Sequence, residues 1–147
     1  MTKEIKKGYK FSEEVYADTC FDAWGNNLNE LFTNCALALS EIMIDLKTLK
    51  FKIKKKINLK NNTIDALLIE FLEEIIYLKD AEMLLFSKFH INIKNVDDTY
   101  VLEAEISGDK IDQKTQKLGI DAKAITYHKF KVEQKNDKWY AHIIIDV

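Results

Sequence analysis

Proline is absent from this chain, and glycine and cysteine are scarce, with four and two residues. The chain therefore has no proline-rich or glycine-rich linker that would divide it into separately folded parts. Cys20 and Cys35 match no metal-binding spacing and suggest no disulfide framework, so a reducing cytoplasm is the expected compartment. No apolar run is long enough to cross a bilayer, and the first residues do not have the pattern of a signal peptide.

The signatures of common enzyme classes are also missing. We find no glycine-rich phosphate loop, nucleophile elbow, zinc signature or Walker-type lysine. Neither cysteine has a histidine or lysine near it in the sequence that would favour the thiolate. Glu73 and Glu74 are adjacent on a predicted helix and point in different directions, so they are typical of a solvated surface, not of a catalytic acid pair.

What is present is the composition of one soluble globular domain, which we assign to residues 1–147. Hydrophobic residues make up 47% of the chain and charged residues 31%, as in ordinary globular proteins. The formal net charge is -2, so the chain as a whole has no electrostatic attraction to nucleic acid.

The N-terminal half contains two segments with helical periodicity. Alternation of period two predicts strands over residues 9–24 and 49–60, and helical spacing predicts helices over 28–45 and from 64 to about 76. Asn26 or Asn27 can cap the first helix, and the segment Asn61-Asn62-Thr63 can cap the second. We expect the charged segment 79–82 to form a break after the second helix.

The C-terminal half is predicted to consist mainly of hairpin strands. Strand spacing covers residues 89–93 and 100–106, with a turn at Asp97-Asp98. Residues 108–119 are predicted to be a loop, and 122–132 a strand that turns at Asn136-Asp137 into the last strand. The almost continuous apolar run before Asp146 is typical of a central strand buried on both faces. The whole pattern predicts an α+β fold, with two principal helices packed on one mainly antiparallel sheet.

A row of lysines alternates with apolar residues between positions 49 and 60. Such a row could hold a phosphate backbone, but it is more often the solvated face of an antiparallel sheet. No aromatic side chains alternate with these lysines to stack on bases, so we favour the solvated face. The row consists of Lys50, Lys52, Lys54, Lys56 and Lys60.

Two acids occupy unusual positions in predicted strands. Asp18 lies in the middle of a strand, where Asp is disfavoured, and Asp146 ends the apolar run Ile143-Ile144-Ile145. An ionised acid at such a place is usually paired, solvated or bound to a metal. A solvated Asp146 with no further role is the simpler reading of the pattern, and the sequence alone does not bring the two acids together.

Several segments spread over nearly the whole chain resemble the archease family. Ala17-Asp18 followed by Ala23-Trp24-Gly25 is similar to the family's N-terminal element, and the segment from Leu68 to Leu78 is similar to its central helix. Residues 84–89, Leu84-Leu85-Phe86-Ser87-Lys88-Phe89, look like the strand entry that follows that helix. Residues 123–128, Lys123-Ala124-Ile125-Thr126-Tyr127-His128, and the ending Ile144-Ile145-Asp146-Val147 match two further elements. The family's His-Thr before the first Asp is replaced here by Val15-Tyr16.

The resemblance implies a small cytoplasmic accessory protein, not an enzyme. Its partner would be the GTP-dependent RNA-splicing ligase, whose guanylylation and multiple turnover in tRNA splicing it would promote. It also implies a divalent metal ion, calcium in our expectation, bound by Asp18, Asp146 and a main-chain oxygen of Val147. Contact with RNA is expected to be only indirect or weak, and no membrane is expected.

Two alternatives remain open at this stage. One is a stand-alone hydrolase that uses a cation at Asp18 and Asp146 to activate water. Against it, the sequence supplies no evident general base beside such a metal. The other is a chaperone-like modulator of RNA-modifying enzymes.

Overall fold

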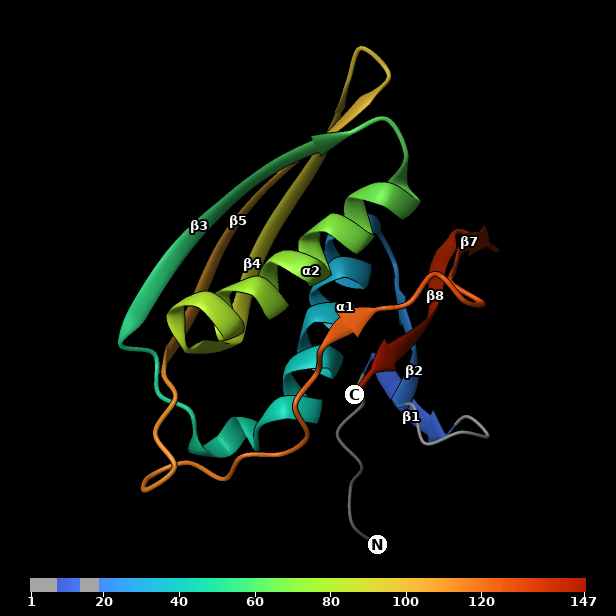
Figure 1. Cartoon of the computed structure of the whole chain (residues 1–147). Helices are drawn as coiled ribbons and strands as arrows, with labels where there is room; N and C mark the ends of the chain where they lie inside the picture. The colour runs from blue at the N-terminus through green and yellow to red at the C-terminus, as the bar shows by residue number, and fades with distance from the viewer. Residues whose placement is uncertain (1–7, 14–18) are drawn as a thin grey trace, which may run out of the picture.

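The computed structural model describes residues 8–13 and 19–147. Within these residues the chain forms two long helices, a short 3-10 helix and eight strands (Figure 1). In chain order they are β1 (Tyr9–Glu13), β2 (Thr19–Gly25), α1 (Leu28–Met43), the 3-10 helix η1 (Leu46–Thr48), β3 (Ile53–Asn61), α2 (Ile64–Glu82), β4 (Leu84–Val96), β5 (Thr99–Lys110), β6 (Ala124–Ile125), β7 (Lys131–Lys135) and β8 (Lys138–Asp146). No helix of this part of the chain is long and apolar enough to cross a membrane.

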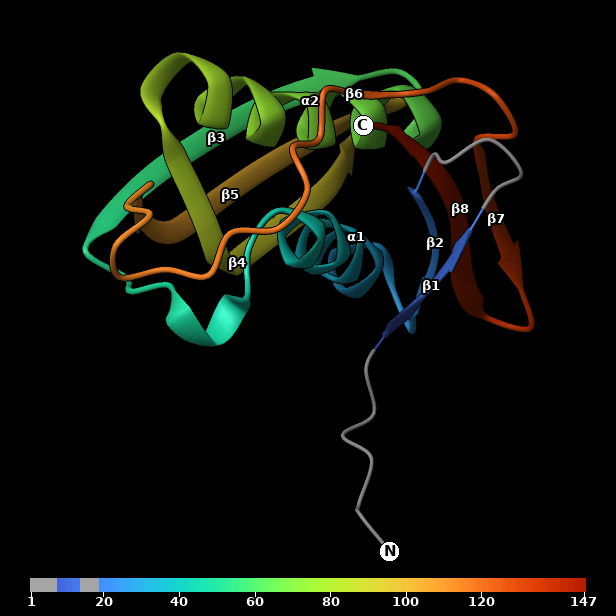
Figure 2. The same ribbon diagram turned by 60° about the horizontal axis from the view of Figure 1, so that its bottom comes forward.

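The strands form two antiparallel sheets, not the single sheet that the sequence pattern suggested. One sheet has the order β3-β5-β4, and the other runs β1-β2-β8-β6 with β7 also paired to β8. Strand β8 is central, because β2 pairs along one edge while β7 and β6 share the other edge. The α+β class is confirmed, and the separation into two sheets follows from the helices that lie between them (Figures 1 and 2).

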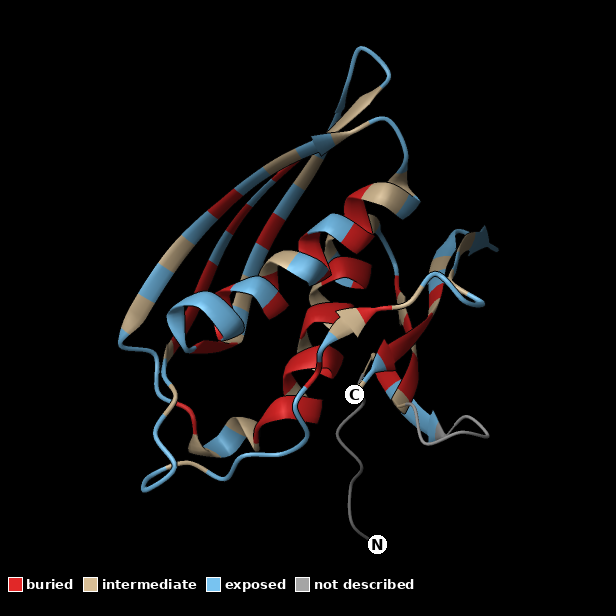
Figure 3. Ribbon diagram, viewed as in Figure 1, coloured by how far each residue is buried: buried red, intermediate tan, exposed pale blue. Residues whose placement is uncertain are grey.

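The hydrophobic core fills the space between the two sheets. Helix α1 contacts β4 of one sheet and β2 of the other, and α2 packs on the three-stranded sheet beside it. Figure 3 shows that the buried residues lie on the inward faces of both helices and of β8. Phe32 of α1 and Phe71 of α2 stack at the centre with ring centroids 6.1 Å apart.

Both helices begin at the polar residues that the sequence placed there. The Asn27 side chain accepts a hydrogen bond from the Glu30 N–H at 2.9 Å, and the Thr63 hydroxyl accepts one from the Ala66 N–H at 3.2 Å. These caps satisfy backbone donors that have no partner within the helix. The helix ends differ from the prediction. The first helix ends at Met43, two residues earlier than expected.

Helix α2 continues through the segment 79–82 that the sequence analysis treated as a break. Lys79, Ala81 and Glu82 are good helix formers, and the buried residues Leu78 and Lys79 anchor the last turns to the core. The helix ends instead at Met83, which adopts the left-handed conformation with φ 57 and ψ 43. A left-handed residue is a common helix terminator, although Met is an unusual residue to fill that position.

Both predicted two-residue hairpin turns are confirmed. Asp97 and Asp98 join β4 to β5, and Asn136 and Asp137 join β7 to β8. All four residues have positive φ, as a type I′ turn requires, and Asp and Asn tolerate that conformation better than most residues.

The alternating segment 9–24 forms two strands, so the prediction of one continuous strand was wrong. Strands β1 and β2 pair antiparallel, from Tyr9 opposite Ala23 to Glu13 opposite Thr19. The two strands therefore run in opposite directions. The periodicity did not reveal this reversal because both strands bury the same kind of alternating face.

The segment 122–132 is likewise interrupted. Its first part forms the two-residue strand β6, and the chain then turns at residues 126–130 before β7 begins. Lys129 in this turn has a φ of 55°. Both short strands pair with β8, so the apolar alternation that suggested one strand reflects two separate pairings with the same partner.

The irregular stretch, predicted over residues 108–119, covers residues 111–123 in the structure. It begins later than predicted because β5 continues to Lys110. It lies against the end of α1, where the Gly119 N–H donates to the Met43 carbonyl at 2.7 Å and the Ile120 N–H donates to that of Ile42 at 2.8 Å. These bonds satisfy carbonyl groups left unpaired at the helix end. A Cβ on residue 119 would meet the Ile42 carbonyl oxygen at 2.3 Å, so the close approach requires glycine.

The lysine row lies on the exposed outer face of the three-stranded sheet, as predicted. The described strand starts only at Ile53, so Lys54, Lys56 and Lys60 belong to β3, whereas Lys50 and Lys52 precede it. The cross-strand neighbours of the three strand lysines on β5 are Ser107, Glu105 and Val101, none of them aromatic.

Gly119→Ala is expected to destabilise the fold by about 1–3 kcal/mol, because the added methyl group must push the loop away from the end of α1. The melting midpoint should fall by about 2–4 °C for each kcal/mol. Thermal unfolding followed by circular dichroism measures this change. Lys114→Ala, on the exposed part of the same loop, is the control and should leave the midpoint almost unchanged; an equal loss in both variants would contradict the role assigned to Gly119.

Candidate functional site

The C-terminal end of β8 combines a rigid backbone with an exposed acid. Ile143, Ile144 and Ile145 are buried, whereas the side chain of Asp146 is exposed. The Asp146 carbonyl accepts a hydrogen bond from the Lys123 N–H at 2.8 Å, and Asp146 pairs with Ala124 of β6. Within the described residues its carboxylate has no ion-pair or hydrogen-bond partner. The backbone is therefore held in place while the carboxylate stays open to a ligand.

The start of β2 lies beside this strand end. The register pairs Thr19 with Ile145, one residue before Asp146. Asp18, the other acid singled out by the sequence, lies outside the described residues, as do Val15 and Tyr16. Val147 follows β8, is half-buried and packs against the core. Asp146 and Val147 are adjacent in the sequence, and the metal site formed by these two residues and Asp18 stays a prediction.

A buried lysine fixes the segment that pairs with Asp146. Lys79 of α2 is only 7% exposed, and its ammonium group bonds Asp121, Asp80 at 2.9 Å and the Ala122 carbonyl oxygen at 2.6 Å. Burial alone would lower the pKa of Lys79, but the hydrogen bonds and charges of Asp121 and Asp80 outweigh it and raise the pKa. Lys79 stays charged and ties α2 to residues 121–122, directly before Lys123.

The turn after β6 exposes two side chains near this end of the sheet. Tyr127 is 73% exposed and His128 is exposed as well. The backbone under them is anchored, because the Thr126 N–H donates to the Ile144 carbonyl at 3.0 Å. These two residues belong to the segment 123–128 that the sequence analysis singled out, and they present an aromatic ring and an imidazole to solvent.

The two cysteines are buried, and His90 and His142 lie on strand faces. Cys20 and Cys35 are both buried and unbridged, and burial raises the pKa of the Cys35 thiol, which makes it a poor nucleophile. His90 lies on the exposed face of β4, and His142 lies on β8 with its Nδ1 at 2.8 Å from Asp22 Oδ1.

The donors at the end of β8 are oxygen atoms, the Asp146 carboxylate and the main chain of Val147. Hard oxygen donors suit calcium or magnesium and are poor ligands for softer metals. Among residues 8–13 and 19–147, no three His, Cys, Asp or Glu side chains come together as a metal-binding group. The donor chemistry therefore fits a hard divalent cation, provided that a further acid is supplied from outside these residues.

The model of the Archease protein family matches residues 9–147. This chain belongs to the archease family. Among curated members, it is 33% identical to the protein archease of Pyrococcus furiosus over 135 residues, which is 91% of this chain and 95% of that protein. It is 30% identical to the protein archease of Methanosarcina barkeri over 142 residues, with 96% of this chain and 97% of that protein covered.

Solved structures of the archease family show the same fold. The solution structure of Methanobacterium thermoautotrophicum protein 1598 has a TM-score of 0.85 and 30% identity, covering 97% of this chain and all of that one. The crystal structure of a Thermotoga maritima archease, described there as a possible chaperone, has a TM-score of 0.62 and 18% identity, covering 100% of this chain and 98% of that one. At that identity the second comparison supports the fold alone.

The sequence pattern singles out Asp146 as a candidate and gives little sign of the anchor around Lys79. The lysine stands inside a run of charged residues that reads as helix surface, and Asp121 is 42 residues away. The only available signal was that Lys79 follows Leu78 at a position where the apolar face of the helix could continue. The pairing across that distance depends on how α2 packs against the loop.

Lys79→Met is expected to lower stability by about 1–3 kcal/mol, because the buried Ala122 carbonyl loses its donor. The melting midpoint should fall by about 2–4 °C per kcal/mol. Since the pKa of Lys79 is raised in the folded state, its contribution is present at all pH values below the ordinary lysine pKa and is lost only as the pH rises through the folded-state pKa.

The matched control is Lys55→Met, which removes a half-buried lysine paired with Glu82 at 2.8 Å. A surface ion pair of that kind contributes at most about 1 kcal/mol. Thermal melts of both variants at neutral pH measure the difference. If Lys55→Met were as damaging as Lys79→Met, the buried anchor would have no special role.

Proposed function

We propose that this protein is an accessory factor of a GTP-dependent RNA-splicing ligase, and that it is not itself an enzyme. The ligase joins a 3′-phosphate or cyclic-phosphate RNA end to a 5′-hydroxyl, and the accessory protein promotes its guanylylation and multiple turnover in tRNA splicing. The observation that carries the proposal is membership of the archease family over residues 9–147, together with an exposed, rigidly held acid at the end of β8.

A divalent cation, calcium in our proposal, is held by Asp18, Asp146 and a main-chain oxygen of Val147. Two carboxylates about 4 Å apart repel each other by about 4 kcal/mol at an effective dielectric constant of 20, and a cation between them reverses the sign of that interaction. When bound, the cation supplies a concentrated positive charge at the protein surface. The pairing of Thr19 with Ile145 supports the assignment. Asp18 directly precedes Thr19 in the sequence, and Asp146 directly follows Ile145.

The rest of the chain holds the backbone of Asp146 in place for ligand binding. Lys79 and Asp121 hold the loop, the Lys123 N–H holds the Asp146 carbonyl, and the buried isoleucines hold β8. A backbone fixed in this way loses little conformational freedom when the Asp146 carboxylate binds a ligand, which favours tight binding.

A second candidate is a chaperone-like modulator of RNA-modifying enzymes. Its support is the shared family, because a Thermotoga maritima member of that family is described as a possible chaperone. The stand-alone hydrolase has no comparable support. The three functions differ in a simple way, because a hydrolase acts without a partner and a chaperone protects many partners.

Calcium is expected to stabilise the protein, and the gain should depend on both acids. At a hundredfold excess over the dissociation constant, binding to the folded state adds about 2.7 kcal/mol, which corresponds to about 5–10 °C in the melting midpoint. Asp18→Asn and Asp146→Asn should each abolish this shift. Without calcium, Asp146→Asn should be no less stable than the parent, because one of two repelling charges is gone.

Asp98→Asn is the control for these variants. It makes the same chemical change in the β4–β5 turn, where Asn fits the positive φ, and should retain the full shift. Thermal melts with calcium and with a chelator, and calorimetric titration of calcium, measure the effect. Retention of the full shift in both Asp18→Asn and Asp146→Asn would refute the metal assignment.

Activation of the ligase is the functional test. With the RNA-splicing ligase of the same organism, the protein should convert single-turnover joining of RNA halves into multiple turnover. Asp18→Asn and Asp146→Asn should impair this activation, and Asp98→Asn should not. Hydrolysis of RNA by the protein alone would favour the hydrolase. Protection of unrelated RNA-modifying enzymes from aggregation, without any effect on ligase turnover, would favour the chaperone.

A further inference from the structure

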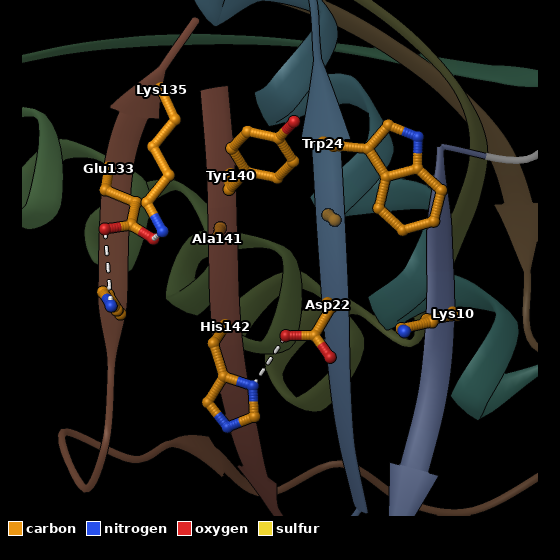
Figure 4. A pocket seen from close by; sticks show the side chains of 10 residues that line it. Lys10, Asp22, Trp24, Glu133, Lys135, Tyr140, Ala141 and His142 are labelled. Carbon is orange, nitrogen blue, oxygen red and sulfur yellow. Dashed lines mark hydrogen bonds and ion pairs between the residues drawn. The ribbon is translucent and has the colours of Figure 1, made fainter. Parts of the chain in front are cut away.

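The outer face of the five-stranded sheet, which faces away from α1, contains a shallow depression of about 530 Å³. Its lining comes from four adjacent strands and is distinct from the end of β8 (Figure 4). The side chains are charged, aromatic and imidazole groups, namely Lys10 of β1, Asp22 and Trp24 of β2, Tyr140 and His142 of β8, and Lys131, Glu133 and Lys135 of β7.

The strand register gathers these residues into two rows across the sheet. One row runs Lys10, Asp22, His142 and Lys131, and the other runs Trp24, Tyr140 and Glu133. Side chains directly opposite each other on neighbouring strands have Cβ atoms about 4.5–5.5 Å apart. The lining residues lie up to 132 positions apart in the sequence, from Lys10 to His142, and only the sheet brings them together.

The acids in the depression are already bound by neighbouring groups. Asp22 lies 2.8 Å from the His142 ring, and Glu133 lies 3.4 Å from Lys131 and 3.2 Å from Lys135. Hydrogen bonds from Lys135 and then Lys131 hold the pKa of Glu133 below its ordinary value. Within the described residues Lys10 has no ion-pair partner. Three lysines against two partnered carboxylates leave a local excess of positive charge.

Two aromatic rings lie between these lysines. Trp24 is half-buried and Tyr140 is 37% exposed, and they are direct cross-strand neighbours. In Figure 4 the two rings stand beside each other, with Lys135 next to Tyr140 and Lys10 below Trp24. Aromatic faces flanked by lysines are the composition with which proteins bind single-stranded nucleic acid, by stacking bases and neutralising phosphates.

The other lysine surface lacks this combination. Lys54, Lys56 and Lys60 of β3 are exposed, but their cross-strand neighbours are Ser107, Glu105 and Val101. The β3 surface continues onto β4 with Lys88 and Lys94, and the ring centroid of the exposed Phe51 lies 5.9 Å from Lys88 Nζ. Its aromatic residue is therefore a single phenylalanine and not a cross-strand pair of rings. This difference makes the β3 surface a matched control.

We propose that the outer face of the five-stranded sheet is a weak binding site for single-stranded RNA, with a base stacked on Tyr140 and Trp24 and adjoining phosphates on Lys10, Lys131 and Lys135. The choice of RNA over DNA rests on the proposed function. His142 precedes Asp146 by four residues on β8, a distance of about 13 Å along a strand. RNA bound here would lie beside the end of the strand that carries the candidate metal ligands.

The test measures RNA binding by the isolated protein, so it requires neither ligase nor metal. A fluorescein-labelled oligoribonucleotide of about 12 nucleotides, a length within the range for single-strand sites, is titrated at several salt concentrations and followed by anisotropy. The variant Lys10→Gln/Lys131→Gln/Lys135→Gln should bind at least tenfold more weakly at about 50 mM salt. The slope of the logarithm of its association constant against the logarithm of salt concentration should be shallower than that of the parent by about 2. The control Lys54→Gln/Lys56→Gln/Lys60→Gln should bind like the parent.

Two single variants are expected to change the affinity for RNA in opposite directions. Tyr140→Leu should lower affinity about 5- to 100-fold, since it removes one stacking partner. Glu133→Gln should raise affinity, because it removes a negative charge while all three lysines remain. Trp24 and Trp139 are the two tryptophans of the chain, so in a Trp139→Phe background RNA should quench the fluorescence of Trp24. Circular dichroism confirms that each variant is folded.

Several results would overturn the proposal. They are the absence of saturable binding by the parent, an equal loss in the two triple-lysine variants, and no change in Trp24 fluorescence at saturating RNA. If Tyr140→Leu does not fold, the lysine set and Glu133→Gln decide the outcome. If the protein activates the ligase normally but does not bind RNA, the RNA-binding proposal is refuted and the proposed function stands. If it binds RNA but does not activate the ligase, the proposed function is refuted and the RNA-binding site stands.

Discussion

The structure depends on the pairing of β8 along both of its edges. Strand β2 covers one edge, and β7 and β6 cover successive parts of the other. An apolar strand such as Ile143-Ile144-Ile145 with an open edge would be a template for aggregation. The three partners remove that edge, and they come from opposite ends of the chain. The five-stranded sheet therefore forms only when the N-terminal hairpin and the C-terminal segment have met.

This constraint also creates the candidate site. Because β6 pairs only with the last residues of β8, the backbone at Asp146 is fixed although its side chain lies in solvent. The buried Lys79 then holds the loop before β6 against α2. A strand end, a loop and a helix end converge at one acid, and rigid support of this kind is what a metal-binding or docking residue needs.

The two sheets use charge in different ways. On the three-stranded sheet, Lys54, Lys56 and Lys60 lie on an edge strand, where charge opposes edge-to-edge association. On the five-stranded sheet, three lysines and the aromatic pair Trp24 and Tyr140 line the same depression, across four strands. The chain has a net charge of -2, and this total hides the difference between the two surfaces, because attraction to a ligand depends on local charge.

The sequence by itself determined what depends on near neighbours in the chain. The caps at Asn27 and Thr63, the turns at Asp97-Asp98 and Asn136-Asp137, and the burial of the last strand are local properties, and all were predictable. The α+β class followed from the order of these elements, and the family resemblance located Asp146.

Only the tertiary structure decided the long-range pairings. Residues 9–24 and 122–132 each alternate like one strand, yet each contains two, because periodicity records which face is buried and not which strand is the partner. The division into two sheets, the Lys79–Asp121 anchor and the pairing of Asp22 with His142 across 120 residues arise from packing. Each of these features joins groups that become neighbours only after loop closure, and local sequence carries little information about such contacts.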